Sequence, residues 1–141
     1  MLRALGGFIA GFVAVLTVHQ ATLWLGTQLH LLQAATWVMT PVPPLHVPQV
    51  VSLAFWGGMW GVLIALLAPR IGTGFGYWFT IAVLFGVGTT LVGWYVVNPL
   101  KGRAAEDLTL ARVVTGGTIN GIWALAVAAI LAVLPGRLRS P

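Results

Sequence analysis

Four long apolar runs constrain the fold of this sequence more than any other feature. None of them contains Asp, Glu, Lys or Arg, and they cover Ala4–Leu25, Val50–Ala68, Phe75–Val97 and Val113–Leu134. Roughly 20 helical residues cross the hydrocarbon core of a bilayer, which is about 30 Å thick. In hydrocarbon a backbone must satisfy its own hydrogen bonds, and four strands are too few to close a barrel. The runs therefore predict an all-α, polytopic integral membrane protein, a bundle of four transmembrane helices that forms one membrane domain over residues 1–141.

The overall composition agrees with a surface that faces lipid. Only 6% of the 141 residues are charged and 59% are hydrophobic, whereas a soluble domain carries roughly 25% charged residues. The formal net charge of +5 comes from single Lys and Arg residues that are scattered along the chain. A nucleic-acid-binding protein gathers its basic residues into a patch or stripe. We therefore expect the lipid bilayer as a partner and no nucleic acid.

The segments between the runs are unequal in length. The first run is longer than the apolar core of a signal peptide, which has about 7–15 residues, so we expect it to be retained as a helix. In the extracytoplasmic loop 26–48, the stretch Gln28–Met39 is apolar enough for a short interfacial helix. The stretch Thr40–Pro48 should be extended because it is rich in proline. Loop 98–112 joins the third and fourth helices. Prolines are predicted just past the ends of the last three helices, at Pro69, Pro99 and Pro135.

The distribution of basic residues predicts the orientation. Basic residues concentrate on the cytoplasmic side of a membrane protein. With both termini in the cytoplasm, the inner side carries four of them and the outer side three, namely Arg3, Arg70, Arg137 and Arg139 against Lys101, Arg103 and Arg112. The excess of Arg over Lys, with abundant Ala, Gly and Val, favours a bacterial source. We expect a multi-pass protein of the bacterial inner (plasma) membrane with cytoplasmic N and C termini.

Glycines recur at a spacing that smooths one face of each helix. Small residues four positions apart let two helix backbones approach closely in a membrane. Such positions are Gly7, Gly11, Gly57, Gly61, Gly86, Gly117 and Gly121. Two interpretations stay open at this point. The smooth faces pack against one another within the chain, or some of them bind other membrane helices, in a homo-oligomer or a larger complex.

A few polar side chains lie inside the apolar runs, and these are His19, Gln20, Thr89, Thr90 and Asn120. We expect them to form hydrogen bonds between helices. An intramembrane polar group is often functional, which makes His19 a weak candidate for binding a cofactor such as haem. A second imidazole is missing, because His30 would lie about 16 Å further along an unbroken helix. The chain has no cysteine, and no metal or cofactor is predicted.

The sequence offers no catalytic residues. The only serines, Ser52 and Ser140, have no base beside them, and Glu106 and Asp107 lie in a short loop with arginines that can neutralise them. Ion-coupled transport usually needs an acidic residue inside the membrane. We therefore predict a non-enzymatic accessory, scaffolding or assembly subunit of an inner-membrane complex. The alternative is an oligomeric passive transporter or channel for a small solute, with the intramembrane polar residues along its pathway. A haem-binding redox protein on His19 is a third, weaker hypothesis.

Overall fold

The computed structural model describes residues 1–134, and most of them are helical. Four helices are long and apolar enough to cross a membrane, and they cover Leu2–Gln28, Gln49–Arg70, Gly74–Leu100 and Leu110–Val133. The prediction of a mostly helical chain with four such helices is confirmed. Each helix begins before the predicted apolar run, and the first and third also end well after it. The reason is that the prediction counted apolar residues only, whereas helix hydrogen bonding continues into polar residues such as Gln28 and Gln49.

Each long helix is built from the following elements. The first comprises α1 (Leu2–Ala14), a π-helical turn η1 (Val15–His19) and α2 (Gln20–Gln28). The second comprises α3 (Gln49–Leu67) and a 3₁₀ turn η2 (Ala68–Arg70). The third comprises α4 (Gly74–Thr80), a π turn η3 (Ile81–Phe85), α5 (Gly86–Val92), a π turn η4 (Gly93–Val97) and α6 (Asn98–Leu100). The fourth is α7 (Leu110–Val133).

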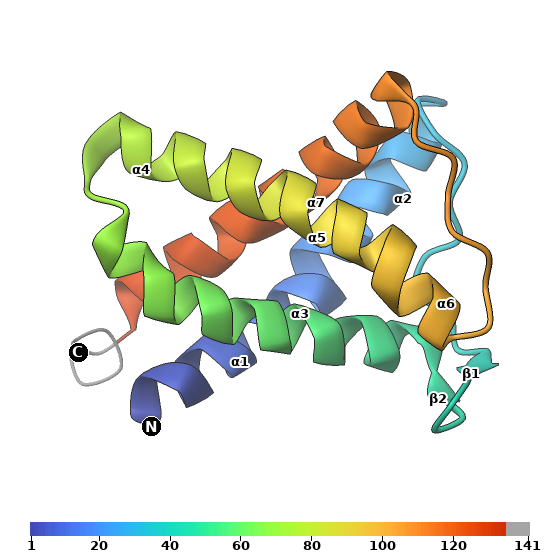
Figure 1. Ribbon diagram of the computed structural model, residues 1–141, viewed down its shortest axis with the longest axis horizontal. Helices are drawn as coiled ribbons and strands as arrows, with labels where there is room; N and C mark the ends of the chain where they lie inside the picture. Colours follow the sequence, from blue (N-terminus) through green and yellow to red (C-terminus); the bar gives the residue numbers. More distant parts are fainter. Residues whose placement is uncertain (135–141) are drawn as a thin grey trace.

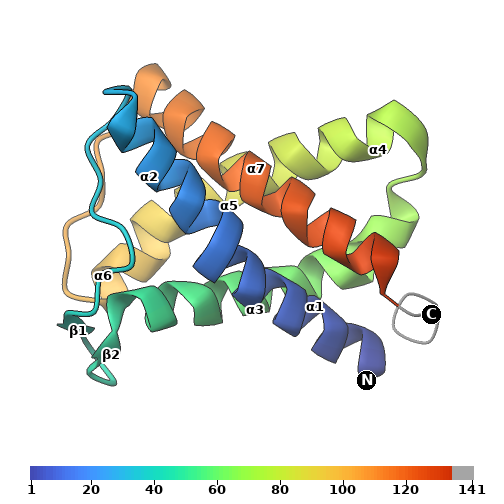
Figure 2. The ribbon, with the colours of Figure 1, turned by 180° about the vertical axis from the view of Figure 1, so that it is seen from behind.

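The helices cross rather than run parallel. α1 packs against α3 and α7, while α5 and η3 pack against the other side of α7 (Figure 1). Figure 2 shows α2 and α7 side by side at one end of the molecule. The start of α1, the last described turn of α7 and the short connection between α3 and α4 share one end. Both long loops lie at the other end, which we call the loop end.

Glycines sit where the backbones cross. A Cβ atom added to Gly7 would lie 2.5 Å from the carbonyl oxygen of Gly61, and one added to Gly11 would collide with that of Gly57. At the second crossing, a Cβ on Gly86 would lie 2.5 Å from the carbonyl oxygen of Gly117. Gly121 faces the Ala82 carbonyl oxygen in the same way, at 3.0 Å. The smooth faces therefore pack against one another within the chain.

The core between the helices consists of small and branched side chains around two aromatic residues, Trp123 and Phe85. Trp123 is 2% exposed, and its indole nitrogen donates a hydrogen bond to the Gly11 carbonyl oxygen at 3.2 Å. This bond ties α7 to the crossing of α1 and α3. The cluster around it includes Ala10, Ala14, Val15, Ala54, Ile64, Ala65, Ile81, Phe85, Ala124, Val127 and Ala128.

The first loop differs from the prediction. Residues 29–40 contain no helix, so the interfacial helix expected over Gln28–Met39 is wrong. The chain instead reverses at His30 and Trp37, which have positive φ angles of 55° and 47°. Such angles interrupt helical hydrogen bonding. The proline-rich part forms a small antiparallel hairpin of β1 (Pro41–Val42) and β2 (Val47–Pro48) rather than one extended strand.

The prolines end only some of the helices. Pro69 lies in the 3₁₀ turn that follows α3, as a helix-ending residue should. Pro99, in contrast, lies inside α6, and the third helix continues to Leu100. The prediction that Pro99 follows the helix end is therefore wrong, because a proline in the last turn removes only one backbone donor. Pro135, Arg137, Arg139 and Ser140 lie outside the described residues.

Candidate functional site

A cavity of about 250 Å³ lies between the four long helices and reaches toward the loop end. Its wall combines aromatic side chains with polar ones from every helix. The aromatic residues are Trp56, Trp60, Trp94 and Trp123, and the polar ones are His19, Gln49, Thr89, Thr90, Asn98, Lys101, Arg103 and Asn120. The structure thus brings together four of the five polar residues predicted inside the apolar runs. Gln20, the fifth, does not line this cavity.

The inner part of the cavity contains a chain of polar side chains. The Asn120 amide donates to the Thr90 hydroxyl oxygen at 2.8 Å, and that hydroxyl donates to the Gly86 carbonyl oxygen at 2.8 Å. Asn120 also faces the imidazole of His19. The His19 Nδ1 atom is buried and has no hydrogen-bond partner among residues 1–134. A buried polar atom is rarely left unpaired in a folded protein. One hydrogen-bonding atom beside the cavity is therefore left without a partner.

Two π-helical turns shape the walls of the cavity. Each π turn inserts one residue into the helical repeat, and such turns are frequent at functional sites. The turn Val15–His19 brings both of its end residues into one wall. The turn Gly93–Val97 contributes Gly93, Trp94 and Val97 to the facing wall. The thickened turns thus bring side chains of the first and third helices into the same space.

Two cations, Lys101 and Arg103, lie at the loop end of the cavity. The cap of the third helix sets their positions. The third helix ends in a glycine cap: the Arg103 N–H bonds to the Asn98 carbonyl oxygen at 2.9 Å, and the Gly102 N–H bonds to that of Pro99 at 3.0 Å. This is the Schellman arrangement, which needs a left-handed residue after the last turn. Gly102 has a φ of 70°. The reversal holds Lys101 and Arg103 at the mouth of the cavity.

Neither of these cations is paired with an acid in the part of the chain that the structure describes. Glu106 and Asp107 are the only acidic residues of the sequence, and their carboxylates lie 2.7 and 3.8 Å from Arg112. Arg103 donates instead to the Gln49 side-chain oxygen at 2.6 Å. Lys101 is 7% exposed. Burial, and secondly the charge of Arg103, lower the pKa of the Lys101 ammonium.

Gln20 has a different role from the one expected. Its side-chain oxygen accepts a hydrogen bond at 2.7 Å from the backbone N–H of Trp37 in the first loop, not from a neighbouring helix. The Trp37 indole N–H also donates to the Leu16 carbonyl oxygen at 3.0 Å. The π turn frees this carbonyl, because the Gln20 N–H bonds to Val15 rather than to Leu16. Trp37 therefore fastens the first loop against the first helix.

Sequence reasoning missed Lys101 and Arg103 as parts of the site, and it missed the contact of Trp37 with the first helix. The two cations were read only as markers of orientation, although a glycine directly after a helix end is a recognisable cap signal. No sequence signal could have paired Trp37 with Gln20, because that contact depends on how the first loop folds back.

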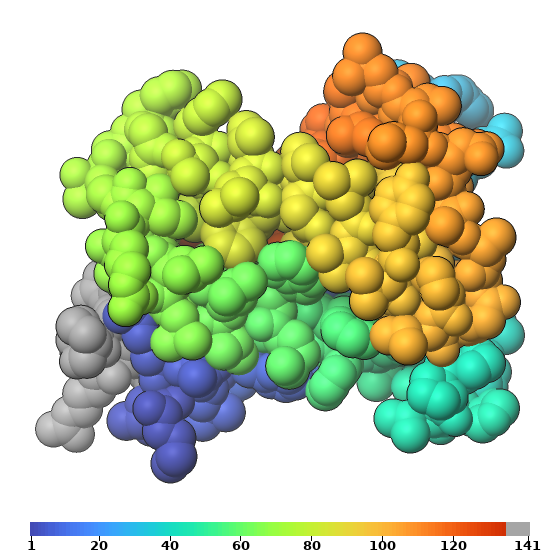
Figure 3. All heavy atoms as spheres, in the orientation of Figure 1, coloured from blue at the N-terminus to red at the C-terminus, as the bar shows by residue number. Residues whose placement is uncertain are grey.

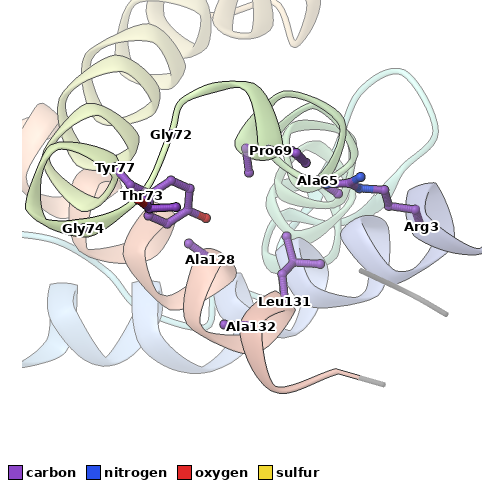
Figure 4. A pocket seen from close by; sticks show the side chains of 11 residues that line it. Arg3, Ala65, Pro69, Gly72, Thr73, Gly74, Tyr77, Ala128, Leu131 and Ala132 are labelled. Atoms are coloured by element: carbon purple, nitrogen blue, oxygen red, sulfur yellow. The ribbon is translucent and has the colours of Figure 1, made fainter. Parts of the chain in front are cut away.

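A second cavity, of about 350 Å³, opens at the opposite end of the molecule. Figure 4 shows Arg3 and Tyr77 on different sides of the opening, with the small side chain of Ala128 and that of Leu131 between them. Its wall is otherwise formed largely by alanine, glycine and proline. It lacks the connected polar side chains of the first cavity, and we therefore take the first as the candidate site.

The residues at hand do not form a metal-binding set. No group of three or more His, Cys, Asp or Glu lies together within residues 1–134. His19 is the one histidine that lines the cavity, while His30 and His46 lie in the first loop. Comparison of the chain with protein-family models, with curated proteins and with solved structures found no match.

Proposed function

We propose that this chain crosses a bilayer four times and binds a small polar solute in its central cavity, without catalysing a reaction. One observation carries the proposal: the polar side chains of His19, Asn120 and Thr90 lie in a cavity that all four long helices line. Polar groups inside a membrane protein cost free energy unless they are paired, and they commonly mark a pathway for a solute. Passive passage of such a solute is the transport function that this arrangement supports.

The surface of the helices supports the membrane part of the proposal. Large hydrophobic side chains are exposed along all four, among them Ile9, Phe55, Phe79, Leu84 and Ile122. Water would make such a surface unfavourable, whereas lipid does not.

The proposed orientation puts both termini in the cytoplasm of a bacterial cell and the loop end outside the inner membrane. Arg3 and Arg70 support it from the terminal end. The mouth of the cavity, at Lys101 and Arg103, then opens on the extracytoplasmic side.

Thiol labelling tests the cavity and the orientation together, because the chain has no cysteine of its own. Gly93 lines the cavity, and a Cβ there would meet nothing within 4 Å, so Gly93→Cys fits without a clash. We expect a hydrophilic, membrane-impermeant thiosulfonate to label this variant in intact cells. A thiol needs water to ionise and react, so the labelling reports water in the cavity.

Met59→Cys is the matched control. In the sequence, Met59 lies between two residues that line the cavity, Gly57 and Trp60, but its own side chain is 49% exposed on the outside of α3. It should stay unlabelled because it faces lipid. Equal labelling of the two variants, or none of Gly93→Cys from either side of the membrane, contradicts the cavity. Labelling of Gly93→Cys only in inverted vesicles reverses the orientation and leaves the cavity in place.

An accessory or assembly subunit is the second candidate, and one feature favours it. α4 contributes no buried residue. Its stacked rings of Phe75 and Phe79 are 85% and 58% exposed, with centroids 6.1 Å apart. An exposed aromatic pair of this kind is suited to packing against another membrane helix.

A further inference from the structure

An apolar pocket of about 330 Å³ adjoins the mouth of the polar cavity. It lies between the β1–β2 hairpin and the start of α3, and its lining includes Pro44, Val47, Val51, Phe55 and Leu100. Lys101 and Trp56 line both this pocket and the polar cavity. Figure 3 shows the hairpin at one corner of the molecule, directly beside the end of the third helix. One lysine therefore stands where an apolar space and a polar space meet.

The positive charges at this junction are not balanced by an acidic side chain in the described part of the chain. Two neighbouring cations without an acidic partner repel each other, and an anion between them relieves this repulsion. Among residues 1–134, Lys101 has no acidic partner, and the neighbouring Arg103 adds a second positive charge. The acidic residues of the third loop are taken by Arg112. An anion at the mouth would supply the missing charge.

We propose that Lys101 and Arg103 bind the carboxylate head of a single-chain amphiphile, whose hydrocarbon tail lies in the apolar pocket under the hairpin. The proposal goes beyond the proposed function, because this site lies beside the mouth of the central cavity and takes an amphiphile rather than the small polar solute. A small inorganic anion would leave the apolar pocket unfilled, and a neutral hydrocarbon would leave the two cations unpaired. The pocket lies at the low end of ligand pockets, which span about 300–1,000 Å³, and this volume suits one chain better than two.

Native mass spectrometry of the full chain in a non-ionic detergent tests the proposal, with dodecanoate, dodecanol, acetate, phosphate and an anionic two-chain phospholipid as probes. Among the five probes, we expect dodecanoate to bind at the lowest concentration, with one molecule per chain. Dodecanol should bind at least about tenfold more weakly, because it lacks the charge that pairs with the cations. Acetate and phosphate should bind more weakly still, because they bury no apolar surface.

Charge-removing variants assign the site. Lys101→Gln should weaken dodecanoate binding about tenfold and leave dodecanol binding unchanged. Arg103→Gln is the second variant, because the Arg103 side chain and its hydrogen bond to Gln49 are exposed, and it should act in the same direction. Arg112→Gln is the control: its guanidinium is already occupied by Glu106, so dodecanoate binding should not change.

Several outcomes would overturn the proposal. The proposal is wrong if dodecanol, acetate or phosphate binds as tightly as dodecanoate, or if the two-chain lipid binds more tightly. It is also wrong if neither Lys101→Gln nor Arg103→Gln weakens dodecanoate binding. If one of these occurs while Gly93→Cys is labelled from the loop end, the amphiphile site is wrong and the polar cavity stands. If Gly93→Cys also stays unlabelled, the proposed function fails with it.

Discussion

At the scale of single residues, the mouth of the cavity depends on the backbone of Gly102. Its left-handed conformation completes the cap of the third helix and sets the directions of Lys101 and Arg103. Trp37 has a comparable position in the first loop, where its two N–H groups bond to Gln20 and Leu16. Each of these residues joins a loop to a helix end, so a single substitution there acts on the site from outside it.

Gly102→Ala should lower the free energy of unfolding by about 1 kcal/mol, because an L side chain is strained at positive φ. A Cβ at this position would meet nothing within 4 Å, so backbone strain is the whole expected effect. Denaturant titration in mild detergent measures it. Gly93→Ala is the control: it lies in a helical conformation with open space beside it, and it should leave stability unchanged or raise it. Equal stability of Gly102→Ala and the unsubstituted chain would contradict the argument.

At the scale of elements, the crossing of α1 and α3 positions one half of the cavity wall. The two backbones approach so closely that the carbonyl groups of one helix lie over the glycines of the other. This crossing lets Trp123 reach the Gly11 carbonyl oxygen, and it brings the π turn after α1 beside α3. A change in the crossing should therefore disturb the cavity even though Gly7 and Gly61 lie outside its wall.

Gly61→Ala should destabilise the protein by about 1–3 kcal/mol, the usual cost of overpacking a tight contact. Its added methyl group would collide with the backbone carbonyl of Gly7, which cannot rotate away as a side chain can. Thermal unfolding in detergent, followed by loss of helical signal, measures the change. Gly76→Ala is the matched control, because a Cβ there meets nothing within 4 Å. A crossing that tolerated Gly61→Ala as well as Gly76→Ala would not be as close as described.

At the scale of the whole molecule, the two functional proposals differ in what accompanies the chain. The glycine faces that favoured binding to other helices are used at crossings within the chain. One surface that remains for a partner is the start of the third helix around Phe75 and Phe79.

We therefore expect affinity purification from native membranes in mild detergent to yield the chain without a foreign subunit in fixed proportion. Native mass spectrometry of the product measures this directly. A constant foreign subunit would favour the accessory role over solute binding. In that case Phe79→Ser, which removes one ring of the exposed pair, should release the subunit, while Phe55→Ser on α3 should retain it.

The four long helices could be predicted from the sequence because hydrophobicity is a local property: an uninterrupted apolar run of about 20 residues is long enough to form a helix that could cross a membrane. The spacing of Gly7 and Gly11, or of Gly57 and Gly61, likewise marked a smooth face without naming what covers it. The polar residues inside the runs, among them His19 and Asn120, could be recognised for the same reason.

Only the tertiary structure decided which of these features meet. His19 and Asn120 belong to the first and last helices, and they share a cavity because the glycine crossings set the helix angles and two π turns rotate side chains inward. Hydropathy marks neither the crossing angles nor the π turns, and the glycine spacing marks only a smooth face. The first loop was mispredicted for a related reason: the hydrogen bonds of Trp37 depend on partners that are distant in sequence, which composition does not reveal. The cap at Gly102, in contrast, has local partners and could have been recognised.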